Sequence, residues 1–169
     1  MAKSLVAFFS WSGATRGLAQ DIAKETGSDL FEVDPVPTYS RDYNVIMTES
    51  KDEVANKVHP EINDANIDLD DYDVVFVGTP VWWGTMAPPI ATFLSDHDWS
   101  GKIVMPFCTH GGGGKTFTEK DMRKLFKGAD IRKMFVSRSR DHLAAEDHLD
   151  AWLADNHLDL APKPSALSA

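Results

Sequence analysis

The chain has 169 residues, of which 43% are hydrophobic and 25% charged, and this suits one globular domain with a substantial core. Its formal net charge of −9 argues against a nucleic-acid partner, whose phosphates demand a basic surface. The single cysteine, Cys108, excludes a disulfide within the chain and a cysteine-based metal cluster. The apolar runs are far shorter than the roughly 20 residues of a membrane helix, and the start lacks a signal-peptide pattern. We therefore expect a cytoplasmic protein that binds no metal and no membrane.

The first half of the chain predicts two strands and two helices. The apolar run 5–9 predicts a strand, and the spacing of apolar residues predicts a helix over 15–26 that Gly27 ends. Residues 30–33 predict a short second strand. The pattern then loosens, with a helix predicted from Tyr43 to about His59 and an acidic solvated loop over 68–73.

The second half alternates in the same way. A continuous apolar run predicts a third strand buried on both faces, and two prolines can start the helix that follows it. Thr118 and Asp121 resemble a capping box at the start of a later helix. The predicted elements are the strand 74–77, a helix from Pro88, the strand 102–108, a helix over 118–126, the strand 131–136 and a helix over 142–156.

Five short apolar runs that alternate with helices predict an α/β fold, a doubly wound five-stranded parallel sheet with helices on both faces. Residues 1–160 would form this single domain, and 161–169 a loose tail. In such sheets ligands bind beyond the carboxyl ends of the strands. Loops 10–15, 79–87 and 109–114 follow three predicted strands, so we expect them to share one rim.

The first loop combines hydroxyls with a glycine at the start of a helix. The hydroxyls of Ser10, Ser12 and Thr15 and the backbone N–H groups around Gly13 can converge on one anion, where the helix dipole also favours negative charge. Arg16 follows and can assist. The alternative is a Ser/Thr-rich turn that merely caps the helix.

The second loop contains two adjacent tryptophans, Trp82 and Trp83. Because successive side chains of an extended segment alternate, at least one indole should line the rim, where it suits packing against an aromatic ring system. The alternative is that both are core or partner-contact residues.

The third loop resembles the P-loop of nucleotide triphosphatases but has Thr109 where that motif has glycine. No metal-binding aspartate ends a neighbouring strand, which disfavours a nucleotide hydrolase. Four consecutive glycines instead suit a backbone that passes close to a flat ligand. His110 is a candidate proton donor or ligand contact, although a lone histidine in a loop is more often neither.

Together the motifs Ser-Trp-Ser-Gly-Ala-Thr at 10–15, Thr-Pro-Val-Trp-Trp-Gly-Thr-Met at 79–86 and Thr-His-Gly-Gly-Gly-Gly at 109–114 resemble the three flavin-binding loops of short-chain flavodoxins and flavodoxin-like FMN proteins. The resemblance implies the strand order 2-1-3-4-5 and FMN as cofactor, with the redox chemistry on the flavin ring and none on a catalytic side chain. This chain differs from the best-known flavodoxins because its third loop has no clear tyrosine. The implied cofactor-binding residues are Ser10, Trp11, Ser12, Gly13, Ala14, Thr15, Thr79, Pro80, Val81, Trp82, Trp83, Gly84, Thr109, His110, Gly111, Gly112 and Gly113.

The resemblance predicts an electron carrier that shuttles electrons on the flavin between redox partner proteins. The acidic chain would suit partners with a basic surface. The alternatives are an NAD(P)H-dependent quinone or azo reductase on the same fold, a P-loop-like nucleotide hydrolase, and an interaction module that binds no small molecule.

Overall fold

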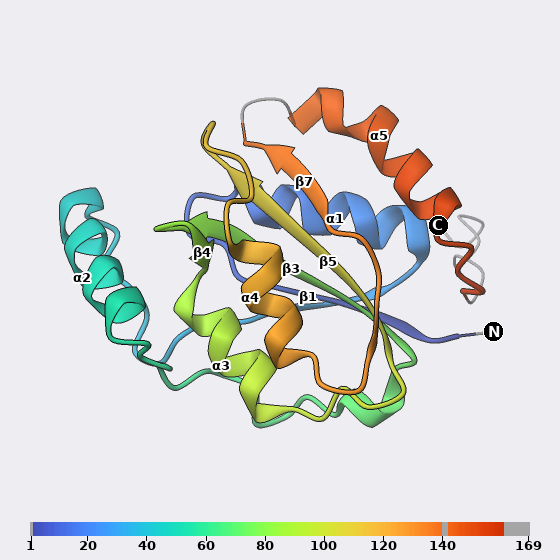
Figure 1. Ribbon diagram of the computed structural model, residues 1–169, viewed down its shortest axis with the longest axis horizontal. Helices are drawn as coiled ribbons and strands as arrows, with labels where there is room; N and C mark the ends of the chain where they lie inside the picture. The colour runs from blue at the N-terminus through green and yellow to red at the C-terminus, as the bar shows by residue number, and fades with distance from the viewer. Residues whose placement is uncertain (1, 140–141, 161–169) are drawn as a thin grey trace, which may run out of the picture.

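The computed structural model describes residues 2–139 and 142–160, which form one twisted sheet covered by helices (Figure 1). The sheet has the order β2-β1-β3-β5-β6, and neighbouring strands along this path are parallel. These strands are β1 (Ser4–Phe8), β2 (Asp29–Glu32), β3 (Val74–Trp82), β5 (Ile103–His110) and β6 (Asp130–Ile131). The predicted doubly wound topology is confirmed, since the first strand lies between the second and third.

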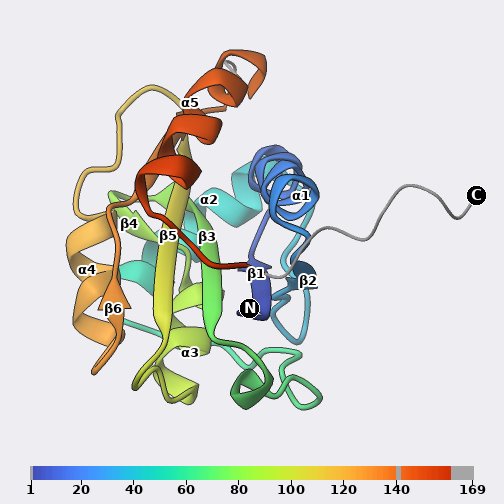
Figure 2. The ribbon, with the colours of Figure 1, turned by 90° about the vertical axis from the view of Figure 1, so that its right-hand side faces the viewer.

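The helices form two layers (Figure 2). Helices α1 (Ala14–Thr26) and α5 (His142–Asp155) cover one face, where Phe76 and Phe107 are fully buried. Helices α3 (Pro88–Asp96) and α4 (Thr118–Leu125) cover the other, around Phe93 and Trp99. No helix in the described ranges has the length and apolarity to cross a bilayer.

Two of the predicted strands differ clearly from the observed ones: one is longer, and the other is interrupted. Strand β3 continues to Trp82 and pairs with the short antiparallel strand β4 (Thr85–Met86), so residues predicted as a loop form a hairpin. The fifth strand is divided into β6 and β7 (Phe135–Arg138), both parallel to β5. Between them the carbonyl of Lys133 accepts a hydrogen bond from the Trp152 indole at 2.8 Å, which links the break to α5.

Helix α2 (Tyr43–Ala55) is shorter than predicted and lies beside the sheet rather than over its centre (Figure 1). Its end is set by Lys57, whose φ of 51° is left-handed. The N–H of Lys57 donates to Val54 and that of Val58 to Glu53, which is the Schellman arrangement that terminates helices. The acidic run after it contains a 3₁₀ turn, η1 (Leu69–Asp71).

The capping box predicted at the start of α4 is wrong. Phe117 occupies the N-cap position, and no side chain caps this helix. The Asp121 carboxylate accepts instead from the Thr85 hydroxyl at 2.7 Å, which ties α4 to the hairpin. The buried Thr118 hydroxyl has no hydrogen-bond partner within the described residues.

Candidate functional site

The three loops lie on one rim, as predicted, because they follow the adjacent parallel strands β1, β3 and β5. The Thr15 and Thr109 hydroxyls join the first and third loops through a buried hydrogen bond of 2.8 Å. The rings of Phe9 and Trp82, 5.2 Å apart between centroids, join the end of β1 to the hairpin. One continuous surface therefore carries all three motifs.

The first loop presents backbone donors that the protein leaves unused. No side chain caps α1, and the helix ladder begins only with the bond from the Gly17 N–H to the Gly13 carbonyl at 3.0 Å. The N–H groups of residues 14–16 therefore have no partner inside the helix. The alternative, a hydroxyl that caps the helix, is wrong, because Gly13 is the N-cap residue and the Ser10 hydroxyl accepts from the Gly13 N–H at 3.1 Å. An uncapped helix start with a positive dipole end suits an anion.

The hydroxyls of this loop divide between two roles. Ser10 and Thr15 are buried and hold the loop in shape, whereas Ser12 is exposed. Gly13 has a φ of 102°, and a Cβ there would meet only the tip of Arg16. Ala14 begins the helix.

The Arg16 guanidinium lies beside the first loop, but it is paired with a carboxylate and is not a free cation there. Its guanidinium forms an ion pair with Glu32 at the end of β2. Burial, with Glu32 nearby, raises the pKa of Asp34, and Arg16 partly offsets this rise. The anion site thus consists mainly of backbone dipoles.

The second loop is a β-hairpin whose two-residue turn is Trp83-Gly84. Their φ values of 52° and 82° match a type I′ turn, which usually has Asn or Gly where Trp83 stands. Trp82 points inward and packs against Phe9 and Tyr39, whereas Trp83 is 45% exposed. At least one indole was expected to line the rim, and both Trp82 and Trp83 border the hollow described below.

Other residues of the second loop support the hairpin. The buried Thr79 hydroxyl accepts from the Ala87 N–H at 2.9 Å and donates to the Pro80 carbonyl at 2.8 Å. Val81 pairs with Met86 across the two strands. These contacts hold the chain that leads into and out of the turn.

A cleft of about 220 Å³, here called the rim hollow, lies between the first loop, the hairpin and α2. Sequence reasoning identified only its loop residues and missed those of α2, whose helical spacing gave no sign of the site. Tyr43 packs on Trp11 at 6.3 Å, and Ser50 accepts from the Trp83 indole at 3.0 Å. The hollow is lined by Trp11, Tyr43, Ile46, Met47, Ser50, Val81, Trp82 and Trp83.

Tyr39 is a further residue that the sequence did not single out. Its hydroxyl donates to the Glu53 carboxylate at 2.6 Å, which anchors α2 to the segment before it. Burial and this hydrogen bond raise the pKa of the Tyr39 hydroxyl. The neighbouring Arg41 donates to the Trp11 carbonyl at 3.0 Å and lies over the Trp11 ring.

The third loop folds around His110. Its Nδ1 accepts from the N–H groups of Gly112 and Gly114, at 3.0 and 3.1 Å. An acceptor at Nδ1 assigns the ring to the neutral tautomer with its proton on Nε2. The N–H groups of Gly111 and Gly113 have no partner among the described residues, and a Cβ at either position would meet nothing within 4 Å. The loop therefore combines a fixed imidazole with accessible backbone donors.

Cys108 lies beneath this rim and takes no part in it. The thiol is fully buried in β5, and burial raises its pKa from 9.0 to about 12. A search of the described residues finds no group of three His, Cys, Asp or Glu side chains that could hold a metal ion.

One family of known proteins matches the sequence of this chain. The family model of flavodoxins matches residues 3–156. The chain belongs to the flavodoxin family. A search of the curated proteins finds no match to this flavodoxin-family chain.

Several solved structures resemble this flavodoxin-family chain over most of its length. A flavoprotein from Lactobacillus acidophilus in complex with FMN is 29% identical, with 90% of this chain and 99% of that chain covered and a TM-score of 0.71. A candidate flavoprotein from Bacteroides uniformis is 27% identical, with 90% and 98% covered and a TM-score of 0.79. Another from Bacteroides eggerthii is 29% identical, with 89% and 99% covered and a TM-score of 0.74. The chain thus has the fold of FMN-binding flavoproteins.

Proposed function

We propose that this chain binds FMN on the rim and carries electrons between redox partner proteins. The observation that carries the proposal is the uncapped amino end of α1 on the same rim as the tryptophan hairpin and the glycine loop. A phosphate at one end and a flat ring at the other match this combination of donors and aromatic surface.

The residues present fit the cofactor. The free N–H groups of residues 14–16 and the exposed Ser12 hydroxyl would hold the 5′-phosphate, while Ser10 and Thr15 keep the loop in place. The hairpin at Trp82 and Trp83 and the backbone from Thr109 to Gly113 would flank the ring. The FMN-bound relative from Lactobacillus acidophilus supports this choice of ligand.

FMN, when bound, supplies one- and two-electron chemistry, and the protein sets its surroundings. His110 presents its Nε2 proton from a ring fixed by two backbone bonds. Gly111 and Gly113 offer N–H donors to polar atoms at the ring edge. The indoles of Trp82 and Trp83 would shield one side of the bound ring from water.

The first experiment is a titration of the purified protein with FMN, followed by its visible spectrum. We expect a bound flavin band and saturable uptake; a colourless protein that takes up no FMN would overturn the proposal. The phosphate site is tested by Ser12→Asp, with Ser95→Asp at an exposed position of α3 as the matched control. A carboxylate about 5 Å from a phosphate costs about 3 kcal/mol at an effective dielectric of 20.

Ser12→Asp should therefore weaken FMN binding by about a hundredfold, whereas riboflavin, which lacks the phosphate, should bind the variant as it binds the original protein. Equal weakening of both ligands would place the phosphate elsewhere.

An electron carrier and a reductase differ in whether the protein consumes NAD(P)H steadily without a partner protein. The alternative, an NAD(P)H-dependent quinone or azo reductase, predicts steady NAD(P)H consumption by the FMN-loaded protein with a small acceptor and no partner protein. The carrier predicts no such turnover, and a measured steady rate would replace our proposal by the alternative.

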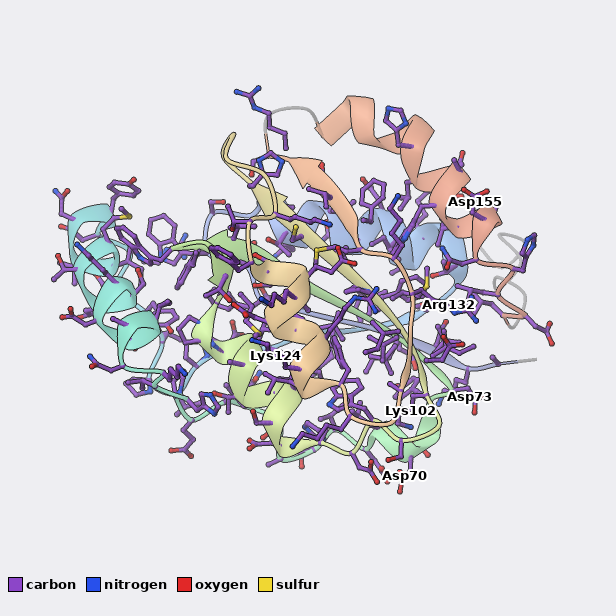
Figure 3. All side chains as sticks on the ribbon, viewed as in Figure 1. Asp70, Asp73, Lys102, Lys124, Arg132 and Asp155 are labelled. Atoms are coloured by element: carbon purple, nitrogen blue, oxygen red, sulfur yellow. The ribbon has the colours of Figure 1, made fainter. Side chains whose placement is uncertain are left out.

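The partner class follows from charge. The net charge of −9 and the exposed acidic side chains of Asp42, Glu49 and Asp52 beside the rim hollow support partners with a basic surface. Asp70 and Asp73 lie at the far end of the strands and would not face such a partner (Figure 3). Electron transfer to a basic acceptor should slow as salt increases, and a rate independent of salt would argue against this partner class.

A further inference from the structure

A second hollow, of about 420 Å³, lies on the other side of the hairpin turn. We call it the α2–α4 hollow, because the end of α2 and helix α4 form two of its walls. Its volume is typical of sites for small organic molecules. It is lined by Glu53, Val54, Lys57, Val58, His59, Trp83, Gly84, Thr85, Met86, Pro88, Ala91, Phe117, Asp121, Lys124 and Leu125.

Strained backbone gathers around this hollow. Four non-glycine residues of the described chain have a positive φ, and His157 alone lies outside this region. Lys57 (51°) and Trp83 (52°) line the hollow, while Thr116 (45°) adjoins Phe117 and donates its hydroxyl to the Gly84 carbonyl at 2.6 Å. Such conformations cost free energy and tend to cluster at binding sites.

Two exposed aromatic side chains face the hollow from segments far apart in sequence. Phe117 is 65% exposed and Trp83 45% exposed. The Trp83 indole is held by its hydrogen bond to the Ser50 hydroxyl at 3.0 Å, and the backbone that carries Phe117 is held by the bond from the Phe117 N–H to the Gly84 carbonyl at 2.9 Å. Exposed aromatic side chains suit a planar ring, which gains by stacking on them.

Two carboxylates and two lysines line the hollow, and they differ in their partners. The Glu53 carboxylate accepts from the Tyr39 hydroxyl at 2.6 Å, and the Asp121 carboxylate accepts from the Thr85 hydroxyl at 2.7 Å. Lys124 on α4, labelled in Figure 3, has its Nζ 3.7 Å from Oδ1 of Asp121. Lys57 has no ion pair within the described residues. The hollow therefore offers an unpaired cation in a chain whose overall charge is strongly negative.

We propose that the α2–α4 hollow binds a small planar aromatic anion, with its ring between Trp83 and Phe117 and its charged group at Lys57. The left-handed conformation of Lys57 supports this assignment. Glycine would hold that helix-ending position without strain, so a lysine there gives up stability and places an ammonium group at the hollow. The proposal does not depend on FMN binding.

The test is a calorimetric titration of the full chain with 2-naphthoate and with 2-naphthylmethylammonium, which share a ring system and differ in charge. We expect saturable binding of the anion, about fivefold tighter than the cation. Lys57→Gln should weaken the anion about fivefold and should not weaken the cation, which no longer meets a like charge. Phe117→Ala should weaken both probes. Lys24→Gln, on the exposed side of α1, makes the same charge change and should leave both affinities unaltered.

Lys57→Gly separates binding from folding. This variant relieves the left-handed strain, so its melting temperature should rise while its affinity for 2-naphthoate falls. The proposal is overturned if neither probe saturates, if the two probes bind equally, if Lys24→Gln weakens the anion as much as Lys57→Gln, or if Lys57→Gly retains full affinity.

Discussion

Replacing Thr15 or Thr109 by valine tests the buried contact that joins the first and third loops. The two side chains are only 1% and 4% exposed, so a hydroxyl that loses its partner finds no water in its place. A buried polar group without a partner costs about 1–3 kcal/mol. We expect each single variant to lose about 2 kcal/mol of unfolding free energy.

The double variant Thr15→Val/Thr109→Val removes both hydroxyls and leaves none unsatisfied. It should therefore lose much less than the sum of the two single losses, with a coupling of about 1 kcal/mol or more. The assay is urea unfolding of the FMN-free protein, with equal denaturant slopes checked for all variants. Thr48→Val on the exposed side of α2 is the control and should stay within about 0.5 kcal/mol.

Strict additivity of the two losses would refute this reasoning. It would mean that the hydroxyls do not depend on one another and that the first and third loops are held together by other contacts.

Three further outcomes are expected. His110→Phe removes the acceptor of the Gly112 and Gly114 N–H groups, so the hydrogen exchange of these two amides should accelerate and the affinity for FMN should fall. The free energy of unfolding should stay within about 1 kcal/mol of the original value. Unchanged amide exchange would contradict this prediction. Gly78→Ala places a Cβ 2.1 Å from the Phe107 ring, inside the sheet, and should cost about 1–3 kcal/mol in thermal or urea unfolding; a neutral variant would show that the ring can move freely. Burial raises the pKa of the Cys108 thiol to about 12, so the native thiol should resist a disulfide reagent at pH 8 and react on unfolding. Because the unfolded thiol ionises first, near pH 9.0, this group should also make stability fall between about pH 9 and 12; rapid native labelling would contradict the burial.

The doubly wound parallel sheet and the first loop were predictable from patterns along the chain, because continuous apolar runs that alternate with helical spacing admit few topologies and right-handed crossovers select among them. The strand order 2-1-3-4-5 was expected only from the resemblance to flavodoxins. Gly27 ends α1 as expected, with a left-handed φ of 69°. The hydroxyl-rich turn after the first strand was placed correctly at the start of α1.

The hairpin could not be predicted in the same way. Its turn places Trp83 where Asn or Gly normally gives the signal, so the sequence indicates a strand end rather than a reversal. The strain at Trp83 persists because the indole is bonded to Ser50 and the next carbonyl is held by Thr116 and Phe117. These partners are distant in sequence, and no local pattern announces them.

The same reason explains the missed residues. Tyr39 and Ser50 reach the site through single contacts from a segment whose apolar spacing looked irregular. His110 was noticed, but its two backbone bonds depend on how four glycines fold, and their sequence leaves that open.

Helix α2 stands out for how little of it is buried. Among its residues only Ile46 and Ser50 are buried, and contacts from Trp11, Tyr39 and Trp83 attach it to the rim. A segment held by so few contacts opens at a lower free energy than the sheet unfolds. In the proposed FMN complex, opening of α2 would uncover the hairpin side of the site, so the Tyr39–Glu53 hydrogen bond, which anchors α2, would influence how fast the cofactor leaves.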